Sequence, residues 1–111
     1  GVFSFPKTGK YLVEFCLNFY LNNGVQRFGQ SLIRSTPDDS NFVTVASSSG
    51  NTSMSTTSVH SSAIAMTIID CTDIANIKVH FRSSFANSST VMWTSVHENI
   101  TYAKFMRLGD V

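Results

Sequence analysis

The chain of 111 residues has few charged side chains. They make up 14% of the sequence, and eight Lys and Arg residues against seven Asp and Glu residues give a formal net charge of +1. A typical soluble domain contains about 25% charged residues. Without an excess of either sign, the sequence lacks the electrostatic field that draws proteins to nucleic acid or to anionic lipid. We therefore expect no nucleic-acid partner.

Cysteine is scarce as well. Cys16 and Cys71 are the only two, and each lies within an apolar run. Two cysteines cannot form the dense disulfide framework that stabilises many small secreted domains. We expect two buried free thiols, with a single Cys16–Cys71 bridge as the alternative. No CxxC pair and no Cys/His cluster has the spacing of metal ligands, so the sequence predicts neither a metal centre nor another cofactor.

Long apolar runs are also missing. None approaches the length of about 18 residues that crosses a bilayer, and the first residues lack the layout of a signal peptide, so we expect no membrane insertion. The length suits one domain with one core, covering residues 1–111. Because the chain opens at Gly1 without an initiator Met and enters a strand-like segment at once, we expect it to be the C-terminal part of a longer polypeptide.

Helix-favouring stretches of Glu, Lys and Ala are absent, whereas β-branched and aromatic residues are abundant. The clearest early strand runs from Tyr11 to Tyr20. Its alternation predicts one face in the core and a second, half-polar face that a neighbouring sheet or subunit covers. The core face holds Tyr11, Val13, Phe15, Leu17 and Phe19, and the second face holds Leu12, Glu14, Cys16, Asn18 and Tyr20.

Turn residues divide the first third of the chain. Phe3 and Phe5 predict a short strand that forms a hairpin with the strand after it, across the turn at residues 6–9. Asn22, Asn23 and Gly24 favour a tight hairpin turn, because Asn-Gly readily adopts positive φ angles. They predict a strand from 25 to 34, which Pro37 and two Asp residues end.

A Ser- and Thr-rich tract occupies the middle of the chain. The sequence predicts a short strand from Phe42 to Ala46, a loop from Ser47 to Asn51, and an exposed strand after it. The next segment, Ala63 to Ile69, is apolar on both faces and predicts a buried strand that ends at a tight turn in 70–73.

The last third predicts three strands. Ile74 to Phe85 alternates well, with Ile77, Val79, Phe81 and Phe85 inward and Asn76, Lys78, His80, Arg82 and Ser84 outward. Further strands are expected at Met92 to Val96 and at Tyr102 to Leu108. Eight to ten short antiparallel strands with regularly spaced turns indicate an all-β sandwich of the jelly-roll type.

The opening segment GVFSFPKTGKYLVEF resembles the early strand pair of the complement C1q and tumour-necrosis-factor-like jelly rolls, which reads roughly G-x-F-x-x-P-x-x-G-x-Y-x-x-x-F. Gly1, Phe3, Pro6, Gly9, Tyr11 and Phe15 all match it. The segment Ile68 to Phe81 is similar to the family's strand, acidic turn and strand, with Asp73, Ile74 and Ala75 replacing the usual Gly-Asp turn. The ending TYAKFMRLGDV resembles the terminal aromatic strand. The family's first strand would precede Gly1, so it lies upstream or a neighbouring chain covers the edge that it leaves.

More narrowly, GVFSFPKTGKYLV with the ending FMRLGD resembles trimeric fibre-tip and capsid-decoration domains of tailed bacteriophages. The wider family is three-fold symmetric, so the resemblance implies a homotrimer. The last strand fits this, because both of its faces are apolar and two-sided burial needs two partners. The alternative is a central strand in a monomeric sandwich. The candidate subunit-interface residues are Tyr11, Phe15, Tyr20, Tyr102, Met106 and Leu108.

Catalytic signatures are missing. His60, His80 and His97 do not stand beside a nucleophile in any known pattern, and no paired carboxylates suit glycoside hydrolysis. The pairs Asp38–Asp39 and Asp70–Asp73 offer oxygen ligands for calcium, but Asp near a turn more often shapes the turn. We therefore expect a protein that is not an enzyme.

Trp93, the only tryptophan, is a candidate surface contact for a sugar or protein ligand, although core packing is the more common use of the residue. Two functions remain open. One is a homotrimeric structural module on a virion surface, either a capsid decoration or a tail-fibre tip, whose partners are itself, other virion proteins and a host-surface glycan or receptor. The other is a secreted, extracellular ligand or pattern-recognition domain of the C1q and tumour-necrosis-factor type. The weakly charged Ser-, Thr- and Asn-rich composition favours the first; an upstream signal peptide or collagen-like repeats would favour the second.

Overall fold

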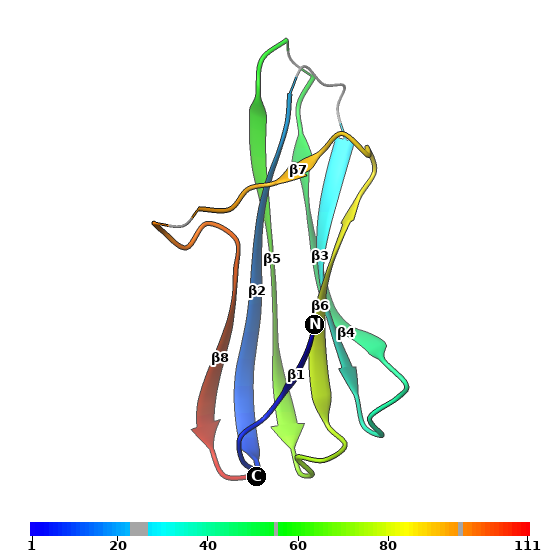
Figure 1. Cartoon of the computed structure of the whole chain (residues 1–111), viewed down its shortest axis with the longest axis vertical. Helices are drawn as coiled ribbons and strands as arrows, with labels where there is room; N and C mark the ends of the chain where they lie inside the picture. The colour runs from blue at the N-terminus through cyan, green and yellow to red at the C-terminus, as the bar shows by residue number, and fades with distance from the viewer. Residues whose placement is uncertain (23–26, 55, 96) are drawn as a thin grey trace.

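The protein is a β-sandwich of two antiparallel sheets, as the strand pattern predicted (Figure 1). A computed structural model describes residues 1–22, 27–54, 56–95 and 97–111, and within these ranges it contains no helix. The first sheet has the order β1-β6-β3-β4. In the second sheet β2 is central, with β5 on one side and β7 and β8 on the other. The strands are β1 (Val2–Ser4), β2 (Gly9–Leu21), β3 (Arg27–Thr36), β4 (Val43–Thr52), β5 (Val59–Cys71), β6 (Lys78–Phe85), β7 (Val91–Met92) and β8 (Tyr102–Gly109).

The core lies between the sheets and is built on the alternation of β2. Its inward residues are all buried, which confirms the face assigned from the sequence: Tyr11, Val13, Phe15, Leu17 and Phe19. From the first sheet, Ile33 and Val79 meet them and are fully buried. The ring of Phe81 contacts those of Phe3, Phe15 and Phe105 at centroid distances of 5.6, 5.3 and 5.6 Å. Aromatic packing thus ties β1, β2, β6 and β8 together.

Strand β6 has the predicted inward and outward faces, but it begins at Lys78, four residues later than expected. The delay comes from a turn centred on Asp73. The Asp73 carboxylate accepts hydrogen bonds from the backbone N–H of Ala75 and the side-chain amide of Asn76, and its carbonyl accepts one from the N–H of Ile77. These bonds hold the chain in a turn where apolar alternation alone predicted a strand.

His80 points outward from β6 as predicted, yet it is only half-exposed. The ring of Phe42, which precedes β4, lies against it edge-on at 4.9 Å. Burial, followed by the positive charge of Arg34, lowers the pKa of His80. Its Nδ1 is buried and has no hydrogen-bond partner among the described residues. His80 is therefore packed against Phe42 on the outer surface, and its surroundings favour the neutral imidazole.

The predicted hairpin between the first two strands is wrong. Strand β1 pairs with β6 in the first sheet, with Phe3 opposite Val79, whereas β2 pairs with β5, β7 and β8 in the second. The turn after Pro6 carries the chain from one sheet to the other. The Asn-Gly turn predicted at 22–24 lies largely outside the described residues, as do the first two residues of the strand expected from 25.

The Ser-rich tract forms a strand where a loop was expected. Strand β4 continues through Ser47–Asn51, paired along its length with β3, and the next strand does not begin until Val59. Gly50 of β4 lies so close to β5 that an added Cβ would stand 2.3 Å from the Ser62 carbonyl oxygen. The small side chains of the tract thus allow the edges of the two sheets to meet. Near the other end of the chain, the strand expected at 92–96 is reduced to Val91–Met92.

Candidate functional site: the outer face of the β5-β2-β8 sheet

The acidic turns do not form an open cation site. Asp38 Oδ1 accepts hydrogen bonds from the backbone N–H groups of Ser40 and Asn41 and from the hydroxyl of Thr36, and Oδ2 accepts one from the Asn41 side chain. The bonds with Asn41, first from its backbone and then from its side chain, lower the pKa of Asp38 well below its usual range. Among the described residues, no three His, Cys, Asp or Glu side chains are grouped so that they could hold a metal ion.

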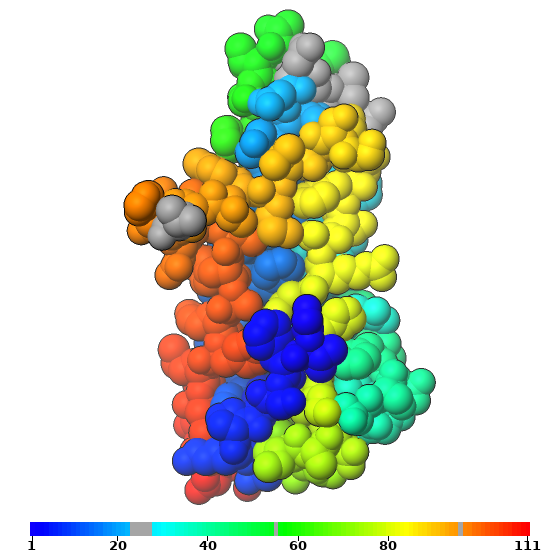
Figure 2. Space-filling model, viewed as in Figure 1, coloured from blue at the N-terminus to red at the C-terminus, as the bar shows by residue number. Residues whose placement is uncertain are grey.

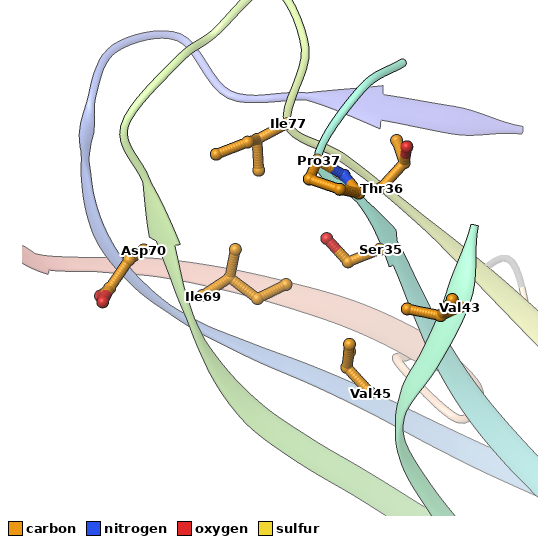
Figure 3. A pocket seen from close by; sticks show the side chains of 8 residues that line it. All are labelled: Ser35, Thr36, Pro37, Val43, Val45, Ile69, Asp70 and Ile77. Atoms are coloured by element: carbon orange, nitrogen blue, oxygen red, sulfur yellow. The ribbon is translucent and has the colours of Figure 1, made fainter. Parts of the chain in front are cut away.

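A shallow, mostly apolar cavity of about 260 Å³ opens at one end of the sandwich, between β3, β4 and β5 (Figure 3). Val43, Val45, Ile69 and Ile77 point into it. Asp70, on its rim, points away and forms an ion pair with Lys10 at 2.9 Å. The cavity therefore offers apolar contact, without a titratable group directed at its interior.

The largest unusual feature is the outward face of the β5-β2-β8 sheet, which we call the outer sheet face. Register places its residues in rows across the three strands. Leu12 lies between Ile68 and Met106, Glu14 between Met66 and Lys104, and Cys16 between Ile64 and Tyr102. Two further rows, Asn18 with Ser62 and Tyr20 with His60, continue it toward the upper end of β2 in Figure 1.

Strand β5 shows how exposed this face is. Ala63 and Ala65 point into the core and are 2% exposed, whereas Ile64, Met66 and Ile68 are 49, 53 and 59% exposed. The prediction of a strand buried on both faces is therefore wrong for a single chain. The larger side chains lie outward and the smaller ones inward, which is the reverse of what a strand facing water requires.

Glu14 is the one carboxylate at the centre of this face, and it is only 8% exposed. The Tyr102 hydroxyl donates to Glu14 Oε2 at 3.2 Å, and Lys104 Nζ stands 3.7 Å from the same oxygen. The electrostatic interaction with Cys16, and then that with Glu14, raises the pKa of Tyr102, so the hydroxyl keeps its proton and acts as a donor. Tyr102 and Lys104 of β8 thus compensate the negative charge of Glu14. The aliphatic side chains around them offer no further polar groups.

The candidate interface residues separate into two groups. Tyr11 and Phe15 lie in the core, where a second subunit cannot reach them. Tyr20, Tyr102, Met106 and Leu108 do lie on or beside the outer sheet face, at alternate positions of their strands. Sequence reasoning missed the aliphatic members on β5. Ile64, Met66 and Ile68 alternate with a second, largely apolar set, and periodicity alone does not indicate which set faces the core.

The cysteines are both free and buried, as predicted. Cys16 belongs to the outer sheet face, and its sulfur accepts a hydrogen bond from the Asn18 side-chain amide at 3.5 Å. Cys71 ends β5, opposite Gly9, and burial raises the pKa of its thiol. Several residue pairs along the β2–β5 ladder separate the two thiols, so a bridge between them is not compatible with this register.

Trp93 is not a core residue, because 40% of it is exposed. It follows β7 directly, and its backbone N–H donates to the Asn18 carbonyl of β2 at 2.8 Å. Its ring lies 4.5 Å from that of His60, which lies 5.2 Å from that of Tyr20. His80 is remote from this cluster on the other sheet, and His97 is exposed in the segment between β7 and β8. The structure therefore does not bring the three histidines together.

The part of the chain that the structure describes contains no helix long and apolar enough to span a bilayer. Comparison of the chain with known proteins finds no match among protein-family models, curated proteins or solved structures. The likeness to the C1q and tumour-necrosis-factor family accordingly rests on the sequence motifs and stays a prediction.

Proposed function

We propose that this domain is a non-enzymatic structural and binding module that assembles as a homotrimer through the aliphatic rows of its outer sheet face, from Leu12 to Cys16 on β2. The setting we propose is a tailed-phage virion, as a capsid decoration or a fibre tip. A secreted ligand of the C1q and tumour-necrosis-factor type is the second candidate, favoured by the shared opening motif from Gly1 to Phe15.

The observation that carries the proposal is the exposure of Ile64, Met66 and Ile68 beside Leu12 and Met106. Contiguous apolar surface of this kind is rare on monomeric soluble proteins and is typical of protein interfaces. Full burial of each such side chain contributes about 1.5 to 3 kcal/mol. A second copy of the chain carries the same aliphatic surface and is present at the same concentration as the first. This favours self-association over binding of a rarer foreign partner.

Three-fold symmetry is the part of the proposal that the family resemblance supplies. The strand order is compatible with it: apart from the β3–β4 and β7–β8 pairs, strands adjacent in sequence lie in different sheets, as happens when a strand ribbon is wound into a jelly roll. The free edge of β8 is the second supporting feature, because an unpaired strand edge needs a cover in solution.

Multi-angle light scattering on the purified domain tests the proposal. We expect a particle of three times the chain mass of 12.2 kDa that persists at micromolar concentration. A monomer mass at that concentration would refute assembly by this face. The complete reading frame separates the two settings: neighbouring virion genes support the phage module, whereas a signal peptide and Gly-x-y repeats upstream support the secreted ligand.

A further inference from the structure

Three rings form a connected aromatic group at the end of the outer sheet face where β7 reaches β2 (Figure 1). Tyr20 of β2 stands opposite His60 of β5, with ring centroids 5.2 Å apart. The ring of Trp93 stands 4.5 Å from that of His60. We call Tyr20, His60 and Trp93 the aromatic triad. His60 and Trp93 are both exposed, so the triad presents ring surface to solvent.

The backbone of Trp93 is fixed at both of its polar groups. Its N–H donates to the Asn18 carbonyl, and its carbonyl accepts a hydrogen bond from the Thr101 hydroxyl at 2.7 Å. The same hydroxyl oxygen accepts from the Asn18 backbone N–H at 3.0 Å. Thr101 thus joins the segment after β7 to the centre of β2. An exposed tryptophan held in this way is a preorganised contact, because little backbone freedom is lost when a ligand binds.

From this geometry we propose that the triad binds the face of a neutral pyranose sugar in a glycan chain. A pyranose has an apolar face of C–H groups that packs on aromatic rings, and a rim of hydroxyls that needs neutral donors and acceptors. The triad supplies the rings, and the next row supplies the Ser62 hydroxyl and the amide oxygen of Asn18. The Asn18 side-chain N–H groups already bond the Ile100 carbonyl and Cys16 Sγ. This proposal deepens the proposed function and rests on it only in taking the domain to be a binding module.

Charge and row order favour a neutral glycan over a second subunit. Just outside the nearby strand ends lie Asn22, Ser58 and Thr94, none of them charged, so an anionic ligand finds no compensating cation among them. The polar row of Asn18 and Ser62 also separates the triad from the aliphatic rows that begin with Cys16 and Ile64. The described residues between β7 and β8, coloured orange, stand out from the side of the molecule, so a chain-like ligand has access beside them (Figure 2).

Because Trp93 is the only tryptophan, its fluorescence reports on this site alone. The experiment titrates the assembled domain with maltohexaose, cellohexaose and the tetramer of N-acetylglucosamine, and with sialyllactose as an anionic probe. We expect a saturable change in intensity or emission wavelength with at least one neutral oligosaccharide and none with sialyllactose. A response to sialyllactose only, or to none of the four probes, would overturn the proposal.

Two variants separate this inference from the assembly on which it builds. His60→Ala keeps the fluorophore and removes the ring beside it, so we expect roughly tenfold weaker sugar binding with an unchanged particle mass. Met106→Glu, on the aliphatic rows, should dissociate the particle and leave the sugar response of each chain in place. If the Trp93 emission instead shifts on dilution without sugar and follows the Met106→Glu dissociation, the triad is a subunit contact and the glycan site is refuted.

Discussion

The outward faces of the two sheets differ in composition. The β1-β6-β3-β4 sheet turns mainly polar side chains outward, with Val2, Phe28 and Leu32 as exceptions, whereas the β5-β2-β8 sheet turns a group of aliphatic ones outward. The polar set includes Gln30, Arg34, Ser47, Ser49, Arg82 and Ser84, and the aliphatic set includes Leu12, Ile64, Met66, Ile68 and Met106. Folding requires only that inward faces be apolar. The first set is the ordinary hydrated surface, and the second is the surface on which the proposed assembly rests.

Ile68→Lys is expected to have the largest effect on this contrast. The residue is more than half exposed in a single chain, so the fold should change in stability by no more than about 0.5 kcal/mol. In an assembled particle the same change would remove a buried isoleucine and bury an unpaired ammonium, which together weaken association about 1,000-fold or more. Sedimentation velocity over a concentration series measures the shift.

Ser49→Lys is the matched control, because Ser49 is an exposed position on the outward face of the other sheet. We expect no change in particle mass. Dissociation by Ser49→Lys with Ile68→Lys unaffected would reverse the assignment of the two faces.

Phe81→Ala tests the interior that both faces share. Its ring contacts three other aromatic rings, and its loss should lower the free energy of unfolding by about 3 kcal/mol. His80→Ala, one residue away on the hydrated face, should cost only about 0.5 to 1 kcal/mol, from the contact with Phe42. Denaturant unfolding of both variants decides the matter, and equal losses would mean that β6 is packed the other way round.

A smaller effect concerns the pH dependence of the hydrated face. Burial, with Arg34, the N-terminal amine and Arg82, lowers the pKa of His80 in the folded state, so the unfolded chain binds more protons at mildly acidic pH. The contribution of neutral His80 to the free energy of unfolding should therefore be fully present above pH 6.5, the ordinary pKa of histidine, and should be lost as the pH falls through and below that value. His80→Phe should show a smaller loss between pH 7.5 and 5.5 in denaturant unfolding, because the substitution removes the group whose pKa is lowered in the folded state. An equal loss in the variant would rule out His80 as the source.

The all-β fold and the inward faces of β2 and β6 could be predicted from the sequence, because alternation over eight or more residues leaves one consistent face. Partner choice could not be predicted in the same way. Phe3 and Phe5 were assigned to a hairpin with the next strand, yet β1 pairs with β6, more than 70 residues away in sequence by register (Val2 with His80). Local turn signals contain no information on pairing between distant strands.

The outer sheet face was predicted only in part. The half-polar second face of β2 indicated a cover, and Met106 and Leu108 were identified from the last strand. Tyr11 and Phe15 were included because a hydrophobic alternation does not distinguish a core face from an interface. For β5 the sequence is apolar on both sides, so only the packed structure shows that the alanines fill the narrow space between the sheets and the larger residues point out. The position of Trp93 likewise follows only from the structure, which shows its ring in contact with that of His60.

The four methionines allow a direct test of the claim that the outer sheet face is covered in the native particle. Met66 and Met106 lie on that face, Met54 and Met92 lie outside it, and all four are exposed in a single chain. Peroxide oxidation at a concentration that maintains assembly, followed by mass spectrometry of the peptides, compares them within one sample. We predict rapid oxidation of Met54 and Met92 with strong protection of Met66 and Met106. Oxidation of all four at similar rates would contradict the account.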